Sequence, residues 1–74
     1  MSGDEQQRRR AAAYDHAAAV HDQAARMHED AAEFFDRCGR PGRAEYERGV
    51  ARRERTGAAD DRARACREET AGGE

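Results

Sequence analysis

The sequence lacks most of the side chains that build a conventional globular core. Its 74 residues include no leucine, isoleucine or tryptophan, and the 36% that are hydrophobic are mainly alanine. A chain this short also buries only a modest fraction of its surface. We therefore expect one small domain that cannot enclose a catalytic or cofactor pocket, and we predict that the protein is not an enzyme and binds no cofactor.

Other functional classes require features that are also missing. No apolar run approaches the length of a membrane-spanning segment, and the first ten residues, MSGDEQQRRR, contain no hydrophobic signal segment. Lysine is absent, so arginine is the only strong base, and the net charge is −2 with acids and bases interleaved. We expect a cytoplasmic protein of a GC-rich bacterium, with no membrane partner and no broad positive surface for nucleic acid.

The residues that are abundant favour helices. Alanine, arginine and glutamate dominate, whereas β-branched residues are nearly absent. Ser2 and Glu5 have the spacing of a capping box, and Gly39 and Pro41 are suited to ending a helix. We predict an all-α hairpin with a first helix over about 4–38, a turn at 39–42, a second helix over about 43–69 and a frayed tail at 70–74.

An interior glycine leaves the continuity of the second helix open. Gly57 follows Thr56 in the middle of the segment, and a glycine there costs up to about 1 kcal/mol relative to alanine. A continuous helix is the preferred prediction, and a break near 56–57 is the alternative.

The first segment repeats every seven residues. Four neighbouring heptad positions form an apolar face wider than the seam of a simple two-stranded coiled coil. The small residues of this face are Ala17, Ala24, Ala31 and Cys38, and Ala11, Ala18, Ala25 and Ala32. Its larger residues are Val20, Met27 and Phe34, and Tyr14, His21, His28 and Phe35. The opposite, solvated side is expected to carry Asp15, Asp22, Glu29 and Asp36.

The second segment has the same period with smaller side chains. Its two series are Ala44, Ala51, Ala58 and Ala65, and Glu47, Glu54, Asp61 and Glu68. Residues that face each other in an antiparallel hairpin have a constant sum of residue numbers. A sum of 79 pairs Tyr14 with Ala65, His21 with Ala58, His28 with Ala51 and Phe35 with Ala44. Because large residues then lie opposite small ones, the sequence predicts intramolecular Ala-rich packing between these two series.

His21 and His28 raise the question of a metal site. They stand two helical turns apart, about 10.5 Å of rise, which is too far for one helix to offer both to a single ion. We predict no metal site within one chain, and expect His21 to bind Asp61 and His28 to bind Glu54 across the hairpin. A metal-binding or metal-sensing bundle, with His21 of one copy near His28 of another, remains an alternative.

The cysteines and arginines give weaker signals. Cys38 and Cys66 lack a metal-ligand spacing and lie toward opposite ends of the expected hairpin, so we expect free thiols. The arginines within 8–10 and 48–55 are suited to contacting phosphates, but acidic neighbours offset their charge. A nucleic-acid-associated regulator is therefore an alternative that we rank below a protein-binding function.

A two-helix hairpin leaves part of its own apolar surface uncovered. We expect a small non-enzymatic protein–protein interaction module that self-associates or packs on a larger protein partner. The simplest self-association is a homodimer that completes a four-helix bundle. The residues expected at this interface are Val20, Met27, Phe34 and Val50.

Overall fold

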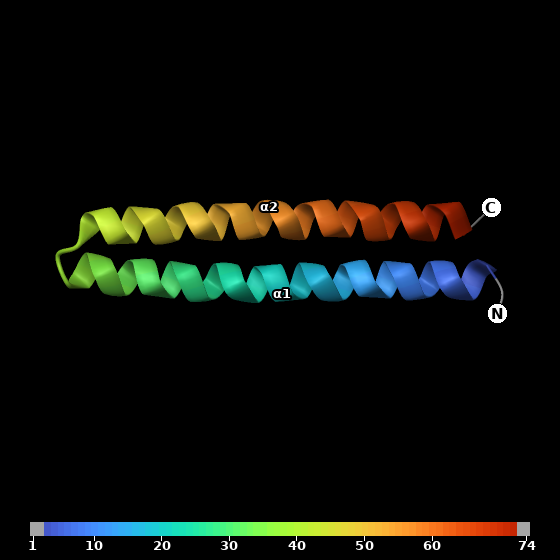
Figure 1. Ribbon diagram of the computed structural model, residues 1–74, viewed down its shortest axis with the longest axis horizontal. Coiled ribbons are helices and arrows are strands. Elements are labelled where there is room, and N and C mark those ends of the chain that lie inside the picture. The colour runs from blue at the N-terminus through green and yellow to red at the C-terminus, as the bar shows by residue number, and fades with distance from the viewer. Residues whose placement is uncertain (1–2, 73–74) are drawn as a thin grey trace.

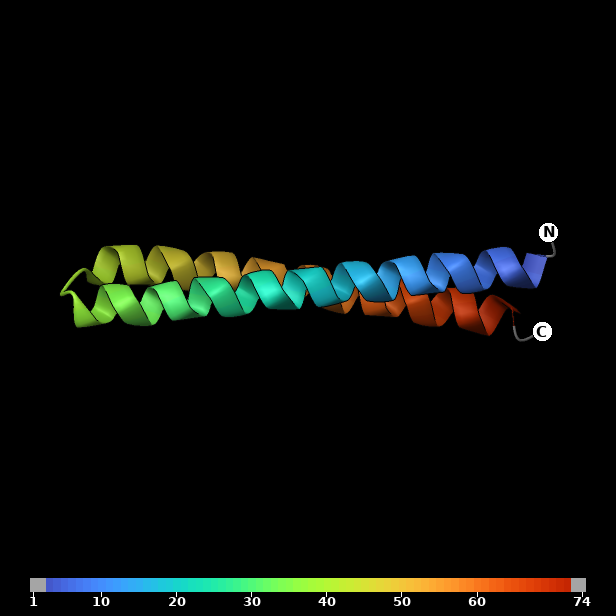
Figure 2. The same ribbon diagram turned by 90° about the horizontal axis from the view of Figure 1, so that it is seen from below.

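The computed structural model describes residues 3–72 and is an antiparallel hairpin of two long helices (Figure 1). Helix α1 spans Gly3–Arg37 and helix α2 spans Pro41–Gly72. The helices lie side by side along the whole rod, which measures 56 × 15 × 10 Å, and they cross at a shallow angle in Figure 2. The all-α, two-helix architecture predicted from the sequence is confirmed.

Gly39 ends α1 through its backbone conformation. Its φ of 70° is the only positive φ among the described residues, and a glycine adopts this left-handed region without steric cost. The N–H of Arg40 donates to the carbonyl of Phe35 at 2.8 Å, and the N–H of Gly39 donates to that of Asp36 at 3.1 Å. These two bonds form a Schellman motif, which satisfies carbonyls that the end of the helix would otherwise leave free.

Pro41 has a different role from the one expected. The sequence placed it in the turn, but it is the first residue of α2. Proline suits this position because its φ is already helical and its missing N–H would have no intrahelical partner there. The carbonyl of Arg40 accepts the N–H of Ala44 at 3.1 Å and so begins the helical bonding. The connection between the helices is therefore only three residues long, 38–40.

Helix α2 runs without interruption through Gly57. The break considered near 56–57 is absent, and the helix continues into the segment that the sequence assigned to a frayed tail, as far as Gly72. Ser2, the first residue of the expected capping box, lies outside the described residues, as do positions 73–74.

Candidate functional site

The contact between the helices is centred on alanines. Four alanines of α1 and four of α2, each spaced by seven residues, are at most 3% exposed. They are Ala11, Ala18, Ala25 and Ala32 in α1, and Ala44, Ala51, Ala58 and Ala65 in α2. Such small side chains let two helices approach closely. The larger residues on either side of this alanine line are therefore the ones that determine the chemistry of the hairpin.

We call the face of α1 that contacts α2 the inner seam. It consists of the four buried α1 alanines and of the residues three positions after them, which are Tyr14, His21, His28 and Phe35. These four larger residues are half-buried. The matching positions of α2 hold the acidic series, in which Glu47 and Asp61 are buried at 9% and 7% exposure. Imidazoles of α1 thus meet carboxylates of α2 beside an alanine core.

His21 lies between two carboxylates of α2. Its Nδ1 donates to Glu54 Oε2 at 2.6 Å, and its Nε2 lies 3.5 Å from Asp61 Oδ2. The hydrogen bond to Glu54 is the main cause that raises the pKa of His21 above its ordinary value, and the negative charges of Glu54, Asp61 and Asp22 add to it. Partial desolvation acts in the opposite direction and is outweighed. The hairpin therefore favours the protonated imidazole.

His28 does not bind the carboxylate expected from the sequence. Its Nδ1 donates to Glu47 Oε2 at 2.5 Å, whereas the expected partner, Glu54, is bound by His21. The acidic series repeats every seven residues, so the heptad offers each imidazole a carboxylate in either direction along α2 and does not choose between them. The occupation of Glu54 by His21 leaves Glu47 for His28.

These contacts do not assemble a metal site within the chain. The two carboxylates bound to His21 lie at opposite nitrogens of the ring, so they do not converge on one ion. Over residues 3–72, no group of three or more histidine, cysteine, aspartate or glutamate side chains is placed to hold a metal ion. Cys38 and Cys66 are exposed free thiols.

One flank of the alanine core is charged. Asp22, Glu29 and Asp36 of α1 pair there with Arg62, Arg55 and Arg48 of α2. The hydrogen bond from Arg62 is the main cause that lowers the pKa of Asp22, with further positive charge from Arg55 and Arg26.

The placement of these acids corrects a sequence expectation. The acidic series of α1 was expected on the side opposite the apolar face, but Asp22 and Glu29 lie at the edge of the contact with α2. These acids follow the large inner-seam residues by one position, and α2 presents arginines at the matching positions. The edge of the inner seam is therefore charged and paired.

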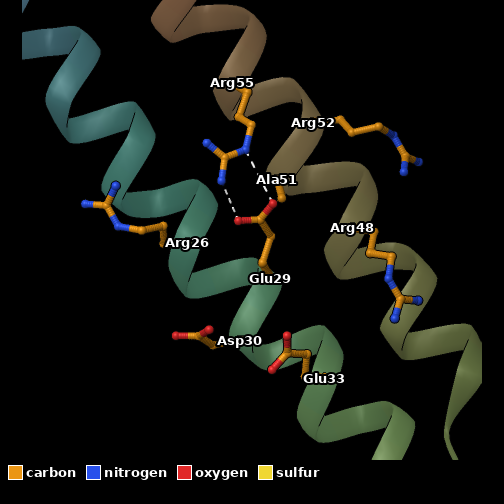
Figure 3. Close-up of a pocket in the computed structure, with 8 residues that line it drawn as sticks. All are labelled: Arg26, Glu29, Asp30, Glu33, Arg48, Ala51, Arg52 and Arg55. Carbon is orange, nitrogen blue, oxygen red and sulfur yellow. Dashed lines mark hydrogen bonds and ion pairs between the residues drawn. The ribbon is translucent and has the colours of Figure 1, made fainter.

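A groove of about 610 Å³ follows this charged flank between the helices (Figure 3). Its lining residues are Arg26, Glu29, Asp30, Glu33, Arg48, Ala51, Arg52 and Arg55. In the close-up, the guanidinium of Arg55 reaches across to Glu29 from the opposite helix. Ala51 is the only apolar residue of the lining, so charged side chains dominate the groove.

The other arginine cluster is also compensated by acids. Arg10 pairs with Glu68 of α2 at 3.1 Å, and Arg9 lies 3.6 Å from Glu5, one turn earlier in α1. In the cluster of α2, Arg52 pairs with Glu45. Acidic side chains therefore offset Arg9, Arg10 and Arg52, which weakens both clusters as a surface for nucleic acid.

A second face of α1 carries large apolar residues that nothing within residues 3–72 covers. We call it the outer seam, and it consists of the partly buried Ala17, Ala24 and Ala31 together with Val20, Met27 and Phe34. The three larger residues are 53%, 65% and 53% exposed. They recur every seven residues, which is the spacing of one core position in the heptad of a coiled coil.

Helix α2 adds apolar residues to the flank on the side of the outer seam. Val50 is partly buried and precedes Ala51, as Ala24 precedes Ala25 in α1. Tyr46 stands one turn before Val50 and is 63% exposed. Val50 is among the residues expected at the interface from the sequence, whereas Tyr46 is not, although it stands four residues before Val50 on the same helix.

The ends of the inner seam are aromatic. The guanidinium of Arg43 lies 4.8 Å from the ring centre of Phe35 near the turn, and that of Arg64 lies 6.0 Å from Tyr14 near the open end. Both are cation–π contacts between the two helices. Phe34 of the outer seam meets Phe35 edge to face at 5.6 Å, so the two seams are in direct contact at this end.

No protein-family model, curated protein or solved structure matches this chain. Over the described residues, neither α1 nor α2 has a stretch that is apolar enough to cross a membrane.

Proposed function

We propose that the protein is a small non-enzymatic interaction module that binds another helix along its outer seam. The observation that carries this proposal is the exposure of Val20, Met27 and Phe34 in a regular heptad on a helix whose other apolar face is already occupied. Side chains this large, exposed in a contiguous line, are typical of a protein–protein interface. The partner helix belongs either to a second copy or to a larger protein.

The energetics of the hairpin support the same proposal. No large side chain among the described residues is fully buried, so alanine supplies most of the apolar burial. Ordering each residue of the chain costs about 1–2 kcal/mol of conformational entropy, and an alanine core offers little burial to offset this cost. Covering the outer seam adds burial of Val20, Met27 and Phe34, each worth about 1.5–3 kcal/mol when fully buried.

Thermal unfolding followed by circular dichroism tests this function. Over a roughly hundredfold range of protein concentration, the midpoint of a self-associating hairpin rises, because association stabilises only the folded state. Met27→Glu places a charge in the outer seam and should remove this rise. Gln23→Glu adds the same charge to an exposed position of α1 outside both seams and should leave it intact. If the wild-type midpoint rises with concentration and Met27→Glu shows the same rise, the outer seam is not the surface of self-association.

A further inference from the structure

The outer seam alternates small and large residues in a regular order. Each alanine is followed three positions later by a larger apolar residue, in the pairs Ala17–Val20, Ala24–Met27 and Ala31–Phe34. Ala13 and Cys38 extend the two series at either end and are both exposed. A partner that fits this surface has to place a large residue opposite each alanine of α1 and a small residue opposite each large one.

A second copy of α1 that runs in the opposite direction presents this complementary surface. In an antiparallel coiled coil, each layer joins the first seam position of one helix to the second seam position of the other. Ala24 then faces Met27 of the second copy, Ala31 faces its Val20 and Ala17 faces its Phe34, with residue numbers that sum to 51. In a parallel pair, Phe34 would face Phe34 and Ala31 would face Ala31, so bulky layers would alternate with voids.

The position of the outer seam on α1 leaves room for this second copy. Each inner-seam residue follows an outer-seam residue by one position, and successive residues of an α-helix are rotated by about 100°. The occupied inner seam and the outer seam thus lie nearly at a right angle, as the neighbours of one helix do in a four-helix bundle. The new interface would be continuous with the established one, because Phe34 already packs against Phe35 of the inner seam.

We propose that the outer seam is occupied by a second copy of this chain, whose α1 lies antiparallel with Ala24 opposite Met27. This inference rests on the proposed interaction function and adds the identity and direction of the partner. The two-fold axis passes between residues 25 and 26. Both copies of α2 then lie on the same side of the α1 pair, and the dimer is a four-helix bundle.

Spin labels on the native Cys38 measure the direction of the partner. Cys66→Ser removes the other thiol, so each chain carries one label. In the antiparallel dimer, Cys38 faces Ala13 of the second copy, so the two labelled backbones lie about 38 Å apart at 1.5 Å per residue. A parallel dimer would bring them within roughly 10 Å. A dimeric mass with the short distance overturns the antiparallel arrangement and leaves the interaction function standing.

Disulfide trapping measures the register. Ala13→Cys in the Cys66→Ser background should form a covalent dimer with Cys38 under mild oxidation, because cysteines whose α-carbons lie within about 7 Å can be bridged. The matched control is Ala12→Cys, an adjacent exposed alanine that is rotated away from the outer seam, and it should not be trapped. Equal trapping of both variants overturns the register in which paired residue numbers sum to 51. So does the absence of trapping in both variants when the protein still has the mass of a dimer.

The solution mass of the wild-type protein separates the remaining outcomes. A monomer at every concentration overturns the second copy as the occupant. The proposed interaction function is then judged on a larger protein partner. A cell protein that the immobilised wild type and Gln23→Glu both retain should be lost from Met27→Glu, and equal retention by all three variants removes the outer seam as the binding surface.

Discussion

The two seams of α1 have the same spacing but different chemistry at their large positions. The inner seam has two histidines there, and they pair with Glu47, Glu54 and Asp61 of α2. The outer seam has valine, methionine and phenylalanine there, which need no charged partner. A seam of paired polar groups specifies its partner through geometry, whereas an apolar seam supplies burial and accepts any surface of the right shape. The difference suggests that the inner seam fixes the register of the hairpin, whereas the interface proposed for the outer seam would contribute affinity.

The largest effect is expected from enlarging a buried alanine of the inner seam. Ala25→Leu inserts a bulky side chain where the helices are in closest contact, and should destabilise the hairpin by about 1–3 kcal/mol. Ala24→Leu, one residue earlier, lies on the outer seam and should change the stability of the isolated hairpin by less than about 0.5 kcal/mol. Urea unfolding at low protein concentration measures both. Equal destabilisation by the two variants would mean that the seams are not distinct.

Replacing Gly49 or Gly57 of α2 by alanine should change the stability of the hairpin by a smaller amount, which depends on how close the glycine lies to the inner seam. A Cβ at Gly49 would meet only the ends of Arg52 and Arg53, at 3.7 Å or more, so Gly49→Ala should stabilise the helix by up to about 1 kcal/mol. A Cβ at Gly57 would lie 3.3 Å from Nε2 of His21, so Gly57→Ala should stabilise less, because the imidazole must shift slightly to make room for the methyl group. Thermal midpoints of the two variants test this, and a larger gain at Gly57 would contradict the tight packing of His21.

The pH dependence of stability separates the polar inner seam from the apolar outer seam. The folded-state pKa of His21 is raised, so its contribution is fully present below the unfolded value, near 6.5, and is lost as pH rises through the higher folded value. Thermal midpoints should therefore fall as the solution changes from mildly acidic to mildly alkaline, and His21→Gln should reduce that fall. An NMR titration in which the His21 ring shows no upward displacement of its pKa would refute this explanation. Met27→Ala on the outer seam should leave this part of the pH profile unchanged.

The charged flank should contribute least. The pKa of Asp22 is lowered mainly by Arg62, so its contribution is present above the unfolded value, near 3.8, and is lost as pH falls through the lower folded value. Asp22→Asn should destabilise the hairpin less than Ala25→Leu does, because exposed ion pairs are weak and are screened by salt. Unfolding measured at low and high salt tests this, and a difference from the wild type that does not shrink with salt would contradict it.

Much of the fold follows from the sequence alone. The helix-forming composition excludes a sheet, Gly39 ends the first helix, and the heptads of α1 and α2 lie within long uninterrupted helices. These features are local, since propensity, capping and periodicity each depend on residues within a few turns of one another. The sequence also indicated that α1 has two contact faces, because an apolar face four heptad positions wide is too broad for a single neighbouring helix.

Only the tertiary structure decided which side chains meet between the helices. The sequence predicted that α2 covers the side of Tyr14, His21, His28 and Phe35, but the shared seven-residue period does not fix which α2 residue each of them contacts. The four alanines at the centre, the pairing of His28 with Glu47 and the position of Asp22 and Glu29 beside α2 all depend on which side chains the second helix presents. The physical reason is that a heptad fixes the angle of a residue around its own helix axis, whereas its partner depends on the rotation and register of the neighbouring helix.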